Sequence, residues 1–447
     1  MRRFGAGQAF LIGGVFVVAA QVAGAQSQAP AAYAITHARI FTVSGAPIDD
    51  GTLVIRDGKI AAVGANVEIP AAAQVIDGKG LQVYPGLFDA VTQMGLSEIS
   101  AVSATVDSAE TGLYNPDVVA ATAILPSSEH IPVTRAAGIT EVLAVPGSGG
   151  FDFSGSRGVI GGQASAIHLS GWTIDEMLIK KSVAMVVNWP EIETRTFDFA
   201  TFSRKEKPFA EAKKEYEKQV SELTELLERA RHYAVAVEHQ KTADFRRDVK
   251  LEALVPVVRG QLAMLVVTDR GRDIRNAVEY ADKQKLKIII AGGTEAYKVK
   301  DLLRSKSVPV ILRPPLTLPS EEDDPYDRLL SQPAELAKAG VRFAIGSFDN
   351  SFARRLGQNA ANAVAYGLPY DEALKAVTQY PAEILGLGDQ VGTLEVGKMA
   401  NVIVTNGDPL EVTTDVRYLF IKGRLTSTDN KHQRLYEKYL NRPKAAE

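Results

Sequence analysis

The chain has 447 residues, of which 46% are hydrophobic and 23% are charged, and its formal net charge is −3. This length supports a large hydrophobic core. The near-neutral charge gives no electrostatic reason to expect a nucleic acid or an anionic membrane as a partner. The sequence contains no cysteine, which excludes disulfides and thiolate metal sites.

Residues 1–25 have the composition of a secretory signal peptide. Arg2 and Arg3 precede an apolar run that extends to Ala20, and small residues follow up to Ala25. The run is short for a membrane span, although an uncleaved anchor is an alternative reading. We therefore expect a periplasmic or secreted bacterial protein that starts near Gln26, with no membrane contact beyond this segment.

Both ends of the chain read as short β-strands. After a small-residue linker over 26–32, residues 33–80 contain alternating apolar segments, with a strong hairpin turn at Asp57-Gly58. Residues 386–426 contain a second set, followed by a tail over 427–447. Neither set can bury a face alone, so we expect the two ends to pair into one small β-sandwich.

The segment between the ends, residues 81–385, alternates buried strands with helical stretches. This alternation is typical of a parallel β/α barrel. The expected strands lie at about 81–89, 140–146, 158–168, 183–189, 263–268, 287–292, 308–313 and 342–347. A charged stretch over 203–232 interrupts the spacing; a solvated crossover helix, a substrate lid and a partner-binding face all remain open for it.

Three motifs carry a resemblance to a known family. They are Tyr84-Pro-Gly-Leu-Phe-Asp89 after an apolar strand, the helical segment 367–386, and Gly392-Thr-Leu-Glu-Val-Gly-Lys-Met-Ala-Asn-Val-Ile-Val404. Together they resemble the amidohydrolase superfamily, in its imidazolonepropionase and prolidase-like branch. The resemblance implies a TIM-like (β/α)8 barrel with a composite β-sandwich, and a hydrolase that acts on carbon–nitrogen bonds of cyclic amides or peptide-like molecules.

The resemblance also implies a metal centre, and here the sequence departs from the family. Family members place a His-x-His pair after the first barrel strand, where this chain has Val91 and Gln93. Valine cannot ligate a metal, and an amide oxygen is a poor transition-metal ligand. The other ligand positions hold Asn188 on strand four, Thr268 and Asp269 on strand five, and Thr294 and Glu295 on strand six. We therefore expect no cofactor, unless zinc or another divalent metal is held by a site rebuilt from non-standard ligands.

Two residues are the candidates for catalysis. Asp349 follows the eighth strand, displaced by Phe348 from the place of the family's aspartate, and His168 ends a predicted strand. The other five histidines read as surface or structural residues: His37, His130, His232, His239 and His432.

Polar side chains are predicted to form a ring at the barrel mouth. Its members are Asp89, Gln93, Glu141, Asp152, Asp269, Glu295 and Asp349. Such groups suit acid–base hydrolysis, a hard cation, or ordinary solvated strand ends. From this ring we assign substrate binding to Gln93, Asp89, Asp269 and Glu295.

Three functions follow from these observations. The first is a periplasmic amidohydrolase with a degenerate metal site. The second is a catalytically silent relative that binds a small ligand, forms a homo-oligomer or pairs with an active homologue. The third is a metal-independent carboxylate enzyme. The sequence does not identify a substrate, because barrel loops set specificity.

Overall fold

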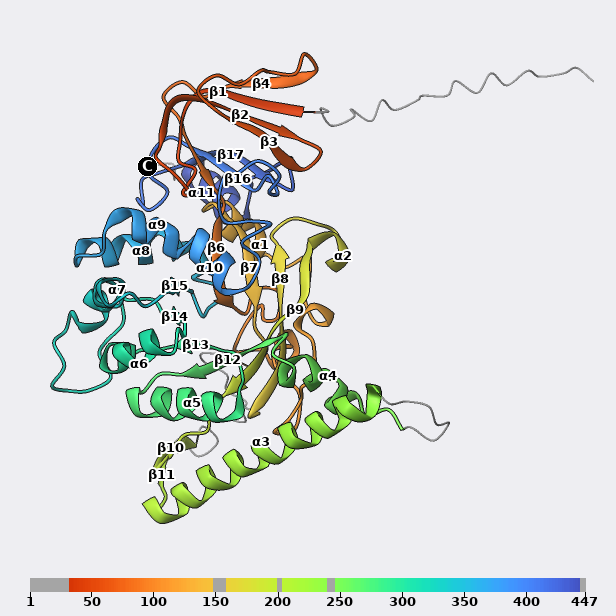
Figure 1. The fold of residues 1–447 in the computed structure, drawn as a ribbon. Helices are drawn as coiled ribbons and strands as arrows, with labels where there is room; N and C mark the ends of the chain where they lie inside the picture. Colours follow the sequence, from red (N-terminus) through yellow and green to blue (C-terminus); the bar gives the residue numbers. More distant parts are fainter. Residues whose placement is uncertain (1–31, 148–157, 199–202, 239–245, 443–447) are drawn as a thin grey trace, which may run out of the picture.

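A computed structural model describes residues 32–147, 158–198, 203–238 and 246–442. The predicted signal peptide, most of the predicted linker, Asp152 and His239 lie outside the described residues. Figure 1 shows a barrel flanked at one end by a separate β-sheet and wrapped elsewhere by helices. No helix among the described residues is long and apolar enough to cross a membrane.

Both ends of the chain build one sheet, as predicted. Its strand order is β18-β17-β16-β5-β1-β2-β3, and β4 pairs with β1. The two ends meet where β5 pairs antiparallel with β16. The strands are β1 (Ala32–Ile40), β2 (Ile48–Arg56), β3 (Lys59–Gly64), β4 (Ala73–Asp77), β5 (Gln82–Pro85), β16 (Val402–Thr405), β17 (Val416–Ile421) and β18 (Arg424–Thr426).

The barrel has eight strands, one at each predicted location. Their order in the sheet follows the chain, from β6 to β15. They are β6 (Leu87–Thr92), β7 (Ile139–Ala144), β8 (Ile160–His168), β9 (Leu178–Asn188), β12 (Ala263–Thr268), β13 (Ile288–Gly292), β14 (Val310–Leu312) and β15 (Phe343–Ile345). The described part of the chain thus contains a nearly closed barrel and a separate sheet, the architecture that the sequence predicted.

Two details differ from prediction. The strand expected at 81–89 is divided at Gly86, so that β5 belongs to the end sheet and β6 begins the barrel. Only glycine fits there, because a Cβ atom would lie 1.7 Å from the Thr140 side-chain oxygen. The second difference is that β8 pairs antiparallel with both β7 and β9. The link from β8 to β9 contains only the short helix α2 (Ile174–Met177), whereas a parallel connection requires a longer crossover.

Helices cover the outside of the barrel (Figure 1). They are α1 (His130–Arg135), α3 (Phe209–Glu238), α4 (Val249–Val258), α5 (Gly271–Gln284), α6 (Lys300–Ser305), α7 (Arg328–Ala339), α8 (Leu356–Ala365), α9 (Tyr370–Ala376), α10 (Gln379–Ile384) and, in the tail, α11 (Lys431–Leu440). The charged stretch starts with β11 (Ser203–Glu206), which pairs with the preceding strand β10 (Arg195–Asp198), and the helix begins only at Phe209. Leu223 and Leu227 of α3 are buried in the core between helices and barrel.

Candidate functional site at the barrel mouth

Alternation along the strands determines which side chains face the barrel interior. Leu265 and Val267 of β12 and Ile311 of β14 belong to the apolar cluster that fills the interior. Side chains two residues apart on a strand face the same side. Asp269 and Arg313, which continue these alternating series past the strand ends, therefore belong to the mouth of the barrel, at the carboxyl ends of β12 and β14.

The residues at the expected metal positions do not fit a metal. Val91 is fully buried in the apolar interior cluster, together with Phe348. Asn188 donates a 2.7 Å hydrogen bond from Nδ2 to the carbonyl oxygen of Gly158. Within the described ranges, no group of three or more His, Asp or Glu side chains could hold a metal ion.

Phe348 occupies the mouth in a backbone conformation that is unusual for an aromatic residue. Its φ is +53°, in the left-handed region that costs a non-glycine residue roughly 1–2 kcal/mol. The Phe348 N–H donates to the Val91 carbonyl oxygen at 2.8 Å, and the Arg313 guanidinium lies 4.5 Å from the centre of the Phe348 ring. The backbone of Phe348 is thus tied to the first barrel strand, and its ring contacts a cation that follows the seventh.

Asp269 holds Arg313 in place. The Nε atom of Arg313 lies 3.1 Å from both carboxylate oxygens of Asp269. Asp269 also accepts hydrogen bonds from the backbone N–H and the hydroxyl of Thr294, at 3.3 and 2.6 Å. Gly292 makes room for this carboxylate, since a Cβ there would lie 2.7 Å from Asp269 Oδ1. Asp269, which was predicted to lie at the mouth, thus contacts Thr294, which follows the sixth barrel strand.

Asp89 helps to close the barrel. Its Oδ1 accepts hydrogen bonds from the backbone N–H of Ser347 at 2.8 Å and of Val91 at 3.4 Å, while Oδ2 is buried without a partner among the described residues. Burial, which disfavours the charged form, raises the pKa of Asp89 to about 7, and the nearby negative charge of Asp349 acts in the same direction. The bond to Ser347 links β6 to the segment after β15.

The other predicted mouth residues have local partners. Asp349 accepts a 2.8 Å bond from the Phe352 N–H, and its carbonyl oxygen accepts one from the Thr92 hydroxyl at 2.7 Å. Glu295 accepts a 2.7 Å bond from the Gly271 N–H at the start of α5 and pairs with Lys298 at 2.9 Å. Gln93 is half-buried directly after β6. Their assigned roles in catalysis and substrate binding remain predictions.

The predicted position of His168 and Glu141 at the mouth is wrong. Because β8 runs antiparallel, its end pairs His168 with Glu141 near the start of β7, at the opposite end of the barrel. There Asn401, which directly precedes β16, donates from Nδ2 to Glu141 and to His168 Nδ1, the latter at 3.1 Å. These residues join the barrel to the end sheet.

Burial shifts both titratable groups of this junction. It lowers the pKa of His168 to about 3, with a smaller contribution from the positive charge of Lys422. It raises the pKa of Glu141 to about 8, against the opposing effect of hydrogen bonds from Thr140 and Asn401. At neutral pH both groups are uncharged, which suits a buried structural network.

Sequence reasoning missed Arg313 and did not include Asn188 among the site residues. A signal for Arg313 was present, because it stands two residues beyond Ile311 at the end of a buried strand, where barrel active sites collect. Nothing in the sequence indicated that Asn401 would contact the end of a barrel strand more than 230 positions away.

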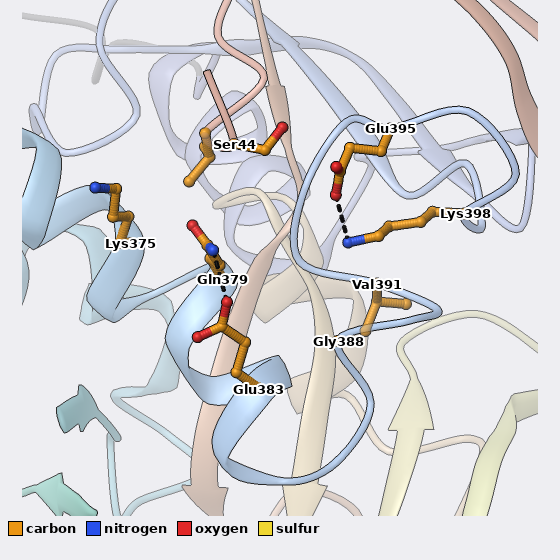
Figure 2. A pocket seen from close by; sticks show the side chains of 9 residues that line it. Ser44, Lys375, Gln379, Glu383, Gly388, Val391, Glu395 and Lys398 are labelled. Carbon is orange, nitrogen blue, oxygen red and sulfur yellow. Dashed lines mark hydrogen bonds and ion pairs between the residues drawn. The ribbon is translucent and has the colours of Figure 1, made fainter. Parts of the chain in front are cut away.

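Figure 2 shows a cavity elsewhere, with a volume of about 260 Å³. It is enclosed by the loop after β1, by α9 and α10, and by the segment 388–398. Its charged side chains are already paired: Lys398 with Glu395 at 2.7 Å, Lys375 with Glu372 at 3.3 Å, and Glu383 with Arg342 at 3.6 Å. The lining therefore presents no uncompensated charge to a ligand.

Comparison with known proteins indicates the protein family that this chain resembles. The model of the Amidohydrolase family matches residues 331–426. Amidohydrolase tasK of Hapsidospora irregularis is 24% identical over 403 residues, which cover 84% of this chain and 39% of that protein. The chain thus spans about two fifths of the length of this curated relative.

Solved structures agree with this placement. An amidohydrolase from Thermotoga maritima MSB8 is 25% identical with a TM-score of 0.75, over 88% of this chain and 99% of that one. A putative prolidase from Bifidobacterium longum is 17% identical with a TM-score of 0.51, over 92% of this chain and 100% of that one, and shows the same fold. Together, the matched segment, the curated relative and the similar solved structures support placing the chain in the amidohydrolase superfamily.

Proposed function

We propose that this protein is a periplasmic or secreted amidohydrolase-type protein that binds a cyclic amide or a peptide-like molecule at the barrel mouth without the family's metal centre. The observation that supports the proposal is the burial of Val91, at a position where the resemblance implies a metal ligand, in the same interior cluster as Phe348. A mouth that keeps Asp269 and Arg313 retains polar groups for recognition.

A partner subunit is part of this proposal. Amidohydrolase tasK is much longer than the stretch that aligns with this chain, so most of that protein lies outside the aligned region. We propose that the present chain forms a homo-oligomer or pairs with an active homologue. Size-exclusion chromatography with light scattering, on the chain starting near Gln26, tests the first option, and affinity capture from the native periplasm tests the second.

Metal analysis and ligand binding test the central claim together. After dialysis, the purified chain is expected to contain well under one equivalent of zinc, and a chelator should leave its melting temperature unchanged. Small amides such as hydantoin and N-acetyl amino acids should raise the melting temperature and remain intact. Stoichiometric zinc after dialysis, together with chelator-sensitive hydrolysis, would show instead a metal site built from other ligands.

A second candidate function is hydrolysis by carboxylates alone. The observation that favours it is the proximity of Asp89 and Asp349, with a pKa of about 7 for Asp89, close to the value expected of a general acid or base at neutral pH. Under this candidate, wild type hydrolyses model amides or lactones with chelator present. Asp349→Asn, or Asp89→Asn, should then abolish the rate while the variant keeps its fold by circular dichroism.

A further inference from the structure

Helix α11 exposes an apolar face. None of its residues is buried against the rest of the described chain. Large apolar side chains nevertheless recur at positions that share one side of a helix. They are Leu435, Tyr436, Tyr439 and Leu440, of which the last three are at least 60% exposed. A surface helix normally packs such a face against other elements, so this face is available to a partner molecule.

Unpaired positive charges border this face. Lys431 and Lys438 are seven residues apart, close to two helical turns, and therefore lie on one side of α11, and Arg442 follows the helix. These three side chains are exposed and have no acidic partner among the described residues, whereas Arg434 pairs with Asp429 at 2.9 Å. Residues 431–442 thus combine three unpaired cations with exposed leucine and tyrosine side chains.

The loop between β14 and α7 carries a surface of the opposite charge. We call its residues 316–326 the acidic loop. Three of its acidic side chains are exposed and have no basic partner in the described part of the chain: Glu321, Glu322 and Asp323. Three large apolar side chains flank them, with exposed fractions of 68%, 85% and 77%: Leu316, Leu318 and Tyr326. The two surfaces are therefore complementary in charge, and both are rich in exposed apolar groups.

The acidic loop lies at the mouth of the barrel. It closely follows Arg313, at the carboxyl end of β14. Tyr297, in the segment after the carboxyl end of β13, donates a 3.2 Å hydrogen bond from its hydroxyl to Asp324 of the loop. A molecule that binds the acidic loop would therefore border the mouth.

Helix α11 lies at the other end of the barrel. Arg434 of α11 is 3.9 Å from Glu129, which directly precedes α1. Helix α1 leads into the amino end of β7, and β7 runs in the same direction around the barrel as β14. The two complementary surfaces of one chain are thus at opposite ends of the barrel, and they can meet only between two molecules.

We infer that α11 of one copy docks on the acidic loop of a second copy. The cations of residues 431–442 then face Glu321, Glu322 and Asp323, and the apolar side chains of the two surfaces pack together. A membrane of anionic lipids would also suit a basic amphipathic helix, but it would leave the apolar side chains of the acidic loop uncovered. A second copy covers both surfaces.

This inference rests on the homo-oligomer of the proposed function and assigns its contact surfaces. It also places the helix of a neighbouring copy at the rim of each mouth. Because the two surfaces differ, the contact is heterologous, and it produces a closed dimer, a ring or a head-to-tail chain.

Molar mass gives the first test. In light scattering on the chain starting near Gln26, the wild type should be a dimer or a larger assembly. Its mass should fall on dilution and when the salt concentration rises, since salt screens exposed charges.

Charge reversal tests each surface separately. Lys438→Glu with Arg442→Glu should weaken self-association by at least about tenfold, because like charges then face one another. Glu322→Lys with Asp323→Lys should have the same effect from the opposite surface. Circular dichroism should show an unchanged fold in both variants, since all four side chains are exposed.

A matched control reverses two charges on another helix. Lys213 and Lys214 are exposed on α3. Lys213→Glu with Lys214→Glu changes the net charge by the same amount as the α11 variant and should leave the mass at its wild-type value.

Mixing the two reversed variants tests the pairing itself. Each variant alone has an α11 and an acidic loop of like charge and should be a monomer. In the mixture, the glutamates of one α11 meet the lysines of the other variant's loop, and the two unchanged surfaces form the wild-type contact. The assembly should therefore return.

The outcomes separate the inference from the proposed function. A wild type that stays monomeric at its highest soluble concentration would overturn the inference and the homo-oligomer, but not ligand binding at the mouth. An oligomer that either reversed variant keeps, or a mixture that stays monomeric, would overturn the inference alone. Binding of the wild type to vesicles of phosphatidylglycerol but not of phosphatidylcholine, lost with Lys438→Glu and Arg442→Glu, would show that α11 docks on lipid instead.

Discussion

The backbone N–H of Phe348 donates a 2.8 Å hydrogen bond to the carbonyl oxygen of Val91, and this bond joins the segment after the last barrel strand to the first strand. Gly346 permits the approach, since a Cβ there would lie 3.1 Å from Val91 N and 3.2 Å from the Phe348 ring. An aromatic and an aliphatic side chain thus share the interior cluster at this end of the barrel.

The left-handed backbone of Phe348 predicts that glycine at this position lowers the free energy of unfolding less than alanine does. Phe348→Ala should lower the free energy of unfolding by about 3–5 kcal/mol, because a buried ring is removed. Phe348→Gly should cost less than Phe348→Ala, since glycine adopts a φ of +53° without strain. Urea denaturation measures both changes.

Phe343 provides the matched control for this comparison. It is buried in β15, and its φ is not positive. Here Phe343→Gly should cost more than Phe343→Ala, because glycine weakens a strand. The same order of alanine and glycine at both positions would contradict the claim that Phe348 is strained.

Restoring histidines should create a weak metal site without activity. Val91→His with Gln93→His adds two imidazoles near the mouth, fewer than the three protein ligands of a catalytic zinc site. The double variant should bind zinc more tightly than wild type, as measured by competition with a chromogenic chelator, and hydrolyse amides and lactones no faster. Gln93→His alone should bind zinc no better than wild type. No gain in the double variant would contradict the placement of both residues at the mouth.

The buried Glu141 should make the protein less stable as the pH rises. With a folded pKa of about 8 and an ordinary value of 4.5, it keeps a proton that the unfolded chain releases. The free energy of unfolding should therefore fall between about pH 4.5 and 8, by up to about 1.4 kcal/mol per pH unit for one such group. Glu141→Gln, which keeps an acceptor for Asn401, should flatten this decline in urea titrations at pH 5 and 8. An unchanged slope would show that Glu141 is charged in the folded protein.

The buried His168 should make the protein less stable as the pH falls. Its pKa of about 3 in the folded protein lies below the ordinary 6.5, so the unfolded chain binds a proton first as the pH falls. Its contribution to stability is complete above about pH 6.5 and is lost progressively toward pH 3. Replacement by leucine should lessen this acid loss. Nuclear magnetic resonance of the ring protons should show no titration of His168 between pH 5 and 8 in wild type.

Deleting residues 391–447 should unfold or aggregate the chain, because it removes β16, the partner of β5. The buried strands of the end sheet, with Ile35, Leu53 and Val83 in their core, would then face solvent. Deleting only residues 431–447 is the control: it removes α11, in which no described residue is buried. A soluble 391–447 deletion with a cooperative melting transition would refute the dependence of one end on the other.

Much of the fold could be predicted from the sequence. Alternation and buried strand runs located all eight barrel strands and both halves of the end sheet, since hydrophobic periodicity is a local property of the chain. The antiparallel direction of β8 was not predicted, because a short connection between two apolar segments does not by itself reveal the direction of the second strand. That one reversal placed His168 at the junction with the end sheet, where Glu141 lies near the start of β7.

The sequence by itself predicted the amidohydrolase architecture, and it indicated a weak first-strand metal site, since valine cannot ligate a metal and an amide oxygen is a poor transition-metal ligand. Only the tertiary structure decided the partners of the remaining polar groups. Asp269 and Arg313 are 44 positions apart, and Asn401 and Glu141 are 260 apart, so contacts across strands set their pairing. The burial of a carboxyl or an imidazole, and hence its charge, depends likewise on packing that no local stretch of sequence encodes.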